Sequence, residues 1–122
     1  MSTSFLEHIL ATAKNAGARD ILIEIHGKEQ RPTSAITFLG LVARARGLLR
    51  RAGTKPGDRV ALLAPNRTMW VACDLAVLSE GAIVVPLYSR QDPRELAVMV
   101  RDCAPALTIA MDAPLADALT AA

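Results

Sequence analysis

The sequence predicts an α/β fold: a parallel sheet of βαβαβ type with helices on both faces, preceded by an N-terminal helix and a short hairpin. Short apolar runs at residues 60–64, 82–86 and 107–111 carry the prediction, and the segments between them have helical spacing. Continuous apolar runs are typical of strands that are covered on both faces. Strands joined by helices form right-handed crossovers, so these strands are expected to lie parallel.

Length and composition suit one compact unit. The chain has 122 residues, of which 52% are hydrophobic, and its mean hydropathy is +0.28. We expect residues 1–36 to form the helix and hairpin, and residues 37–122 to form the βαβ portion of the same unit. The apolar content is high for a small domain. Either the core is unusually rich in aliphatic residues, or an apolar face is covered from outside the chain.

Capping signals begin two helices in the first half of the chain. Ser4 and Glu7 form a capping box at the start of a helix over residues 4–16. Thr37 is a suitable cap for a second helix over residues 37–52. We interpret the basic residues of that second helix as a solvated face: Arg44, Arg46, Arg50 and Arg51.

Between these helices the pattern is that of a hairpin. Residues 21–26 alternate like a half-buried strand, residues 27–30 supply a turn, and residues 34–37 return as the second strand. The first strand has Ile21, Ile23 and Ile25 on one face and Leu22, Glu24 and His26 on the other.

The crossover helices have their own start signals. Asn66 is a suitable cap for a helix over residues 67–79, which is apolar almost all round and should be buried. Asp92 and Pro93 begin the next helix, as an N-cap followed by proline at the first helical position. A weak final helix is expected over residues 113–121.

Charge and composition argue against several protein classes. The net charge of +2 gives no support for nucleic-acid binding. No apolar run is long enough for a transmembrane segment, and the N-terminus lacks the pattern of a signal peptide. Cys73 and Cys103 have no metal-ligand spacing, so we interpret them as buried thiols of a cytoplasmic protein and predict no metal site.

An ordered set of short motifs resembles one enzyme family. The set comprises TF at 37–38, GTKPGDRVAL at 53–62, APNR at 64–67, Trp70, GA at 81–82 and VPLY at 85–88. In this order and spacing it resembles the N-terminal region of the AMP-forming acyl-CoA synthetases of the adenylate-forming superfamily, most of all the long-chain fatty acyl-CoA ligases. The resemblance implies a parent enzyme that uses ATP, magnesium and CoA to convert a fatty acid to acyl-CoA, AMP and pyrophosphate.

The chain lacks the family's reactive motifs. The phosphate loop rich in Ser, Thr, Gly and Lys, the acidic ATP-ribose motif and the C-terminal catalytic lysine all lie downstream of the matching region. We therefore predict no catalytic residue and no cofactor site of the chain's own, and expect this N-terminal piece to be inactive alone and to act as structural scaffold. A smaller departure is Gly40, where the family usually carries an acid that completes a capping box with Thr37.

One loop remains as a candidate ligand site. Ser89, Arg90 and Gln91 follow the second apolar run, and ligands of open α/β sheets bind at the carboxyl ends of strands. The resemblance implies that this loop approaches the CoA nucleotide, where Arg90 could pair with a phosphate. The alternative is a solvent-exposed loop without a ligand.

Other conspicuous residues have structural interpretations. We expect Asp58 and Arg59 to form a turn-stabilising pair and His8 to be a solvated surface histidine. Trp70 and Tyr88 are interpreted as packing anchors. His26, on the Glu24 face of its strand, has no nucleophile near it in the sequence.

Two further readings stay open. The chain could be a stand-alone, non-catalytic binding or interaction module, or the N-terminal part of another adenylate-forming ligase that takes aryl acids or makes fatty acyl-AMP. If the chain is part of a fatty acyl-CoA ligase, its expected partners are the remainder of the synthetase and a second copy of the chain. The second copy would associate at an exposed sheet edge. Peripheral membrane association of the parent is also compatible with the resemblance.

Overall fold

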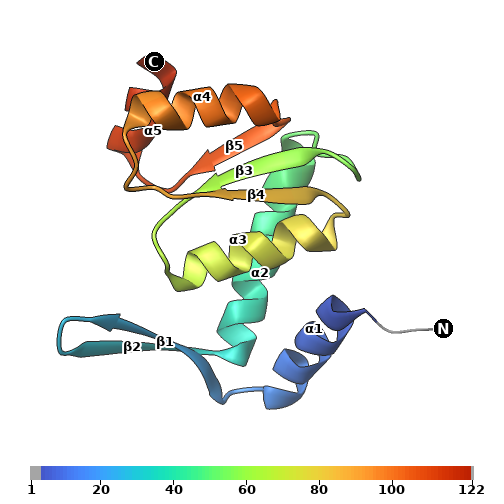
Figure 1. Ribbon diagram of the computed structural model, residues 1–122. Coiled ribbons are helices and arrows are strands. Elements are labelled where there is room, and N and C mark those ends of the chain that lie inside the picture. Colours follow the sequence, from blue (N-terminus) through green and yellow to red (C-terminus); the bar gives the residue numbers. More distant parts are fainter. Residues whose placement is uncertain (1–3, 122) are drawn as a thin grey trace.

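The computed structural model describes residues 4–121 (Figure 1). Its elements are α1 (Phe5–Ala16), β1 (Asp20–His26), β2 (Glu29–Ser34), α2 (Ala35–Arg51), β3 (Arg59–Leu63), α3 (Thr68–Ser79), β4 (Ile83–Leu87), α4 (Pro93–Cys103), β5 (Leu107–Ala110) and α5 (Ala113–Ala121). β1 and β2 form a separate antiparallel hairpin.

The predicted parallel sheet is confirmed. Its strand order is β4-β3-β5, and β3 pairs in parallel with both neighbours. The register places Val60 of β3 opposite Val84 of β4 and Leu107 of β5. α2 and α3 cover one face of the sheet, and α4 and α5 cover the other (Figure 1).

β3 is the centre of the core because it is covered on both faces. Its residues Val60 to Leu63 have no solvent exposure. Val60 and Leu62 pack among residues of α2 and α3, whereas Ala61 and Leu63 pack with Leu96 of α4. The continuous apolar run thus reflects a strand buried from two sides.

The hairpin and the start of α2 lie earlier than predicted. A two-residue turn at Gly27 and Lys28 suffices, with a φ of 64° at Gly27, so the return strand is β2 rather than residues 34–37. α2 is capped by Ser34, whose Oγ accepts the Thr37 backbone N–H at 3.2 Å. Thr37 is therefore not the cap. Gly40 accordingly lies inside the helix instead of in its first turn.

The start of α3 also differs from expectation. Its N-cap position is Arg67 rather than Asn66, and the Arg67 side chain makes no capping hydrogen bond. At the other end of α3, Glu80 accepts from Nε of Arg46 and Nε of Arg50 of α2, each at 2.6 Å. Those two arginines therefore join α2 to α3, which corrects the expectation of a wholly solvated basic face. The two guanidinium groups, Arg50 first, lower the pKa of Glu80.

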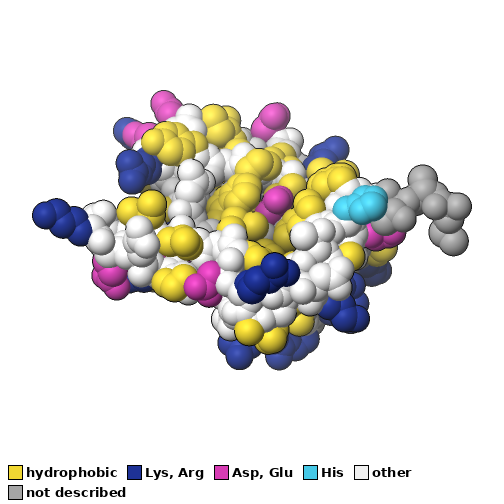
Figure 2. Space-filling model, turned by 90° about the horizontal axis from the view of Figure 1, so that it is seen from below, with side chains coloured by type: hydrophobic (Ala, Val, Ile, Leu, Met, Phe, Trp, Pro, Cys, Tyr) yellow, Lys and Arg dark blue, Asp and Glu magenta, His cyan; other side chains and the backbone are white. Residues whose placement is uncertain are grey.

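The more polar face of β1 points towards the rest of the chain, and its aliphatic face points to solvent. Leu22, Glu24 and His26 are half-buried, whereas Ile23 and Ile25 are 56% and 73% exposed. Seen from below in Figure 2, hydrophobic side chains gather on the face that carries the hairpin and α1. The aliphatic face of the hairpin thus lies outward, because Glu24 of the opposite face binds the start of α3.

Candidate functional site

A cleft of about 630 Å³ lies at the carboxyl ends of β3 and β4, beside the hairpin. This is the position at which open parallel sheets bind ligands. Three segments line it: Glu24 to His26 of β1, residues 64–67 with Trp70 at the start of α3, and Pro86 to Arg90 at the end of β4 and directly after it.

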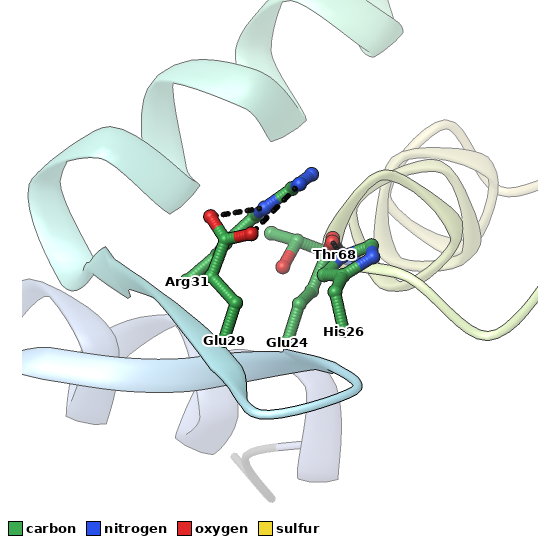
Figure 3. Close-up of polar contacts among 5 residues, drawn as sticks. All are labelled: Glu24, His26, Glu29, Arg31 and Thr68. Atoms are coloured by element: carbon green, nitrogen blue, oxygen red, sulfur yellow. Dashed lines mark hydrogen bonds and ion pairs between the residues drawn. The ribbon is translucent and has the colours of Figure 1, made fainter.

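Glu24 joins the hairpin to the start of α3. Its Oε1 accepts the backbone N–H of Thr68, the first residue of α3, at 2.6 Å, and its Oε2 lies 2.8 Å from Nε2 of His26. Figure 3 shows Glu24 and His26 directed from the hairpin towards Thr68. Because Arg67 offers no capping side chain, Glu24 supplies from another element the acceptor that the first turn of α3 lacks.

The same contacts control the charge of Glu24. The hydrogen bond from His26, followed by that from the Thr68 N–H, lowers the pKa of Glu24 to about 2. Glu24 is therefore a carboxylate throughout the neutral range, and a negative charge lies at the positive end of the α3 dipole.

Two arginines add positive charge to the cleft wall. Arg67 and Arg90 lie on segments that follow β3 and β4, and both are exposed. Within residues 4–121 neither guanidinium pairs with a carboxylate. Asn66 and Ser89 add uncharged polar groups to the wall. With Glu24 engaged by His26 and Thr68, the cleft offers an excess of donors that suits an anion.

Two of the three residues of the predicted ligand loop lie in the cleft, and the third does not. Ser89 and Arg90 line the cleft. Gln91 is held at the start of α4, where its Nε2 donates to Oε2 of Glu95 at 3.1 Å, and it does not line the cleft. Tyr88 is 66% exposed on the cleft wall, so its interpretation as a packing anchor is wrong. Trp70 does pack against the core, and it lines the cleft as well.

Most residues that were predicted to have structural roles have those roles in the structure. Asp58 stabilises its turn by accepting the Lys55 N–H at 2.8 Å, although Arg59 donates elsewhere, to the carbonyl of Cys103 at 3.0 Å. His8 is exposed. Cys73 is buried, which raises the pKa of its thiol.

The structure also tests the predicted burial of Cys103 and the prediction that no segment spans a membrane. Cys103 is half-buried, not buried as expected. Among the described residues, no helix has the length and apolar character needed to cross a membrane.

Among the charged and histidine side chains of the cleft, Glu24, His26 and Arg67 are those to which sequence reasoning assigned no site role. The available signal was Glu24, a charged residue between Ile23 and Ile25 of β1. Its contact with Thr68, 44 positions away, has no local signature. Across residues 4–121 no group of three or more His, Cys, Asp or Glu could hold a metal ion. The side chains that meet in the cleft can bind and orient an anionic ligand.

Comparisons with known proteins agree with the fold and the motifs. A mitochondrial malonate–CoA ligase of Xenopus laevis is 28% identical over 132 aligned positions, which cover 97% of this chain and 22% of the relative. A feruloyl-CoA synthase of an Amycolatopsis species is 42% identical over 66 positions, covering 52% of this chain and 13% of the relative. The chain thus spans about a fifth or less of the length of these relatives.

A solved structure places the same fold inside a longer chain. The fatty acyl CoA synthetase of Mycobacterium tuberculosis superimposes with a TM-score of 0.76 at 24% identity, over 96% of this chain and 24% of that one. The profile of one family, described as AMP-binding enzyme, matches residues 12–122. Since this match covers nearly the whole sequence, the chain belongs to the AMP-binding enzyme family.

Proposed function

We propose that the chain is the N-terminal part of an ATP-dependent acyl-CoA ligase that converts a fatty acid, ATP and CoA to acyl-CoA, AMP and pyrophosphate. Family membership and the ordered motifs from Thr37 to Tyr88 support the reaction class. The similarity of the motifs to long-chain ligases supports a fatty acid as substrate. In this ligase the chain is a structural scaffold, and the remainder of the synthetase is its partner. Both cysteines are free thiols, which favours a cytoplasmic location.

The observation that carries the proposal is the basic cleft at the strand ends. Arg90 and Ser89 follow β4, and Arg67 faces the same cleft from the start of α3. We assign Arg90 to a phosphate of CoA, with Ser89 and Arg67 as further donors, because guanidinium groups without a carboxylate partner bind phosphate strongly. When bound, CoA supplies the thiol that receives the acyl group, and these residues only hold its nucleotide end.

A titration of the isolated chain with CoA tests this assignment. We expect the amide NMR signals of Ser89 and Arg90 to shift, and the shifts to weaken when dephospho-CoA replaces CoA if the contacted group is the ribose phosphate. Arg90→Ala should remove most of the affinity. Arg44→Ala is the matched control, because it removes the same charge from an exposed position of α2 outside the cleft.

The assignment is wrong if CoA shifts residues outside the cleft, or if Arg44→Ala weakens binding as much as Arg90→Ala. Both variants change one exposed arginine, so a difference between them cannot come from net charge alone.

A second candidate is a ligase for an aryl acid. It is favoured by the 42% identity to a feruloyl-CoA synthase over 52% of the chain. A third, the stand-alone binding module, keeps the cleft without adenylation. The coding sequence after Ala122 separates the two ligases from the stand-alone module. A continuing ligase frame with a Ser/Thr/Gly-rich lysine loop supports either ligase, and a stop codon supports the module.

A further inference from the structure

The two cleft arginines are supported by different parts of the chain. Arg90 lies between β4 and α4, in a segment with local contacts: the Gln91 N–H donates to the Tyr88 carbonyl at 3.1 Å, and Asp92 caps α4 directly afterwards. Arg67 lies between β3 and α3, at the N-cap position of a helix whose cap residue makes no side-chain hydrogen bond. Arg67 therefore lacks the local side-chain support that is present beside Arg90.

Glu24 of the hairpin supplies a support for Arg67 from a distant element. Its Oε1 accepts the backbone N–H of Thr68 at 2.6 Å, and this N–H belongs to the peptide group that joins Arg67 to Thr68. The carbonyl of the same peptide group accepts the N–H groups of Trp70 and Val71 at 3.0 and 3.3 Å. In a trans peptide the N–H and the carbonyl point in opposite directions. This peptide plane is thus bonded to the hairpin on one side and to the first turn of α3 on the other, and rotating it would break hydrogen bonds on both sides.

His26 orients the carboxylate that makes this contact (Figure 3). Nε2 of His26 lies 2.8 Å from Oε2 of Glu24, and because an ionised carboxylate can only accept, the Nε2–H is the donor. One carboxylate oxygen is therefore bonded within the hairpin and the other to α3. Although Glu24 and Arg67 line the same cleft, no ion pair joins them in the part of the chain that the structure describes, so the guanidinium stays available to a ligand.

We propose that Glu24 is a positioning residue for anion binding in the cleft. Through the Thr68 N–H it fixes the backbone of Arg67, and so the direction from which the Arg67 guanidinium meets the ligand. The charge of Glu24 repels a phosphate, so its contribution to affinity comes from the hydrogen bond and not from the charge. The inference rests on the proposed function for the ligand, CoA, whereas the positioning of Arg67 can be measured without a ligand.

Two variants of Glu24 separate the hydrogen bond from the charge. Glu24→Gln and Glu24→Ala both remove the negative charge, but only glutamine keeps an oxygen that can accept the Thr68 N–H. In CoA titrations we expect the Kd of Glu24→Ala to be about three- to tenfold higher than that of Glu24→Gln, within the contribution of one hydrogen bond to a charged group. Glu29→Ala is the control. It removes a surface carboxylate of the same hairpin outside the cleft, and it should leave the Kd unchanged.

A double-mutant cycle shows whether the effect of Glu24 passes through Arg67. Adding Glu24→Ala to Arg67→Ala should raise the Kd little further, because the guanidinium that Glu24 positions is already absent. Adding it to Arg90→Ala should multiply the two separate effects, because the hydrogen bonds beside Arg90 do not involve Glu24. A general loss of stability would affect both combinations alike. Equal Kd values for Glu24→Ala and Glu24→Gln, or independent effects of Glu24→Ala and Arg67→Ala, would overturn the proposal.

NMR of the chain without ligand distinguishes a failure of this inference from a failure of the proposed function. If CoA does not bind the wild-type chain, the assignment of CoA is wrong, and the positioning of Arg67 is still measured. Relative to Glu24→Gln, Glu24→Ala should speed hydrogen exchange of the Thr68 amide and lower the heteronuclear NOE of the Arg67 amide, with that of Arg90 unchanged.

Dispersed NMR spectra establish that each variant is folded. Glu24→Asp, whose side chain is shorter by a methylene, takes the place of alanine in the comparison if Glu24→Ala does not fold. An Arg67 heteronuclear NOE that stays at the wild-type value when the acceptor is removed would overturn the inference, whatever the affinity for CoA.

Discussion

At the residue scale, one carboxylate joins the hairpin to α3. The first N–H groups of a helix have no partner within the helix, and α3 has no capping side chain at Arg67. Glu24 accepts the Thr68 N–H instead, and His26 bonds to the second oxygen of Glu24. Because Glu24 also lines the cleft, the same contact that stabilises α3 positions one cleft wall.

Replacing Glu24 by alanine should destabilise the fold. The variant leaves the Thr68 N–H of a buried residue without its acceptor, so we expect a loss of about 1–2 kcal/mol in the free energy of unfolding, measured by urea denaturation. Glu29→Ala is the control, because Glu29 pairs with Arg31 at the surface and such pairs contribute less than about 1 kcal/mol. Equal losses in the two variants would contradict the capping role of Glu24.

The contribution of Glu24 should depend on pH in a defined window. The pKa of Glu24 is lowered from 4.5 to about 2 in the folded chain, so its carboxylate contributes stability that is fully present above pH 4.5. That contribution is lost as the pH falls from 4.5 towards 2. We expect the stability difference between wild type and Glu24→Gln to shrink through this window. A difference that stays constant would show that the charge of Glu24 is not involved.

Which residues could be predicted depended on how local their contacts are. Ser4 and Asp92 each cap the helix that follows them in the sequence, and both were identified from the residues alone. Glu24 caps a helix 44 positions away, so no neighbouring residue indicates its role. Ser89 and Arg90 could be predicted as cleft residues because the carboxyl ends of parallel strands are general ligand positions. Gln91 does not line the cleft, because its side chain donates a hydrogen bond to Glu95.

At the element scale, α2 connects the two parts of the fold. It begins directly after the hairpin, packs against the sheet through residues such as Val42 and Leu49, and is joined to α3 through Glu80. Gly40 lies on its exposed side, and a Cβ atom added there would meet no atom within 4 Å.

Gly40→Ala should stabilise the chain by about 0.5–1 kcal/mol, because glycine in a helix interior is less favourable than alanine by that amount. Gly81→Ala is the contrasting variant. Its φ is 72° and its new Cβ would lie 3.3 Å from Cβ of Pro56, so we expect destabilisation. Thermal unfolding should therefore move to higher temperature for Gly40→Ala and to lower temperature for Gly81→Ala. A shift of both in the same direction would contradict this account of the two positions.

Helices and strands could be predicted where the apolar pattern or the capping residues indicated one position only. Residues 60–63 of β3 are all apolar because both faces of the strand are covered there, and α4 has an N-cap followed by proline. The start of α2 was misplaced because Ser34 and Thr37 are both suitable caps, and in the structure Ser34 is the cap. The exposed side of β1 could not be inferred from polarity, since the aliphatic face lies outward.

At the scale of the whole molecule, the high apolar content of the chain has two causes. The core is aliphatic, built from leucine, valine and alanine around β3. In addition, the isoleucine face of the hairpin and the β5 edge leave apolar groups at the surface. A chain that spans about a fifth of its relatives is expected to show such faces, because in the longer proteins further segments are available to cover them.

The central claim is that this chain builds a ligand-binding wall of an adenylate-forming ligase while the reactive groups are encoded elsewhere. Pyrophosphate release from ATP tests it most directly, with the purified chain incubated with magnesium, CoA and a long-chain fatty acid. We expect no release above that of a reaction without protein. Fatty-acid-dependent release that is lost in Arg90→Ala would contradict it, because the chain would then carry an adenylation centre of its own.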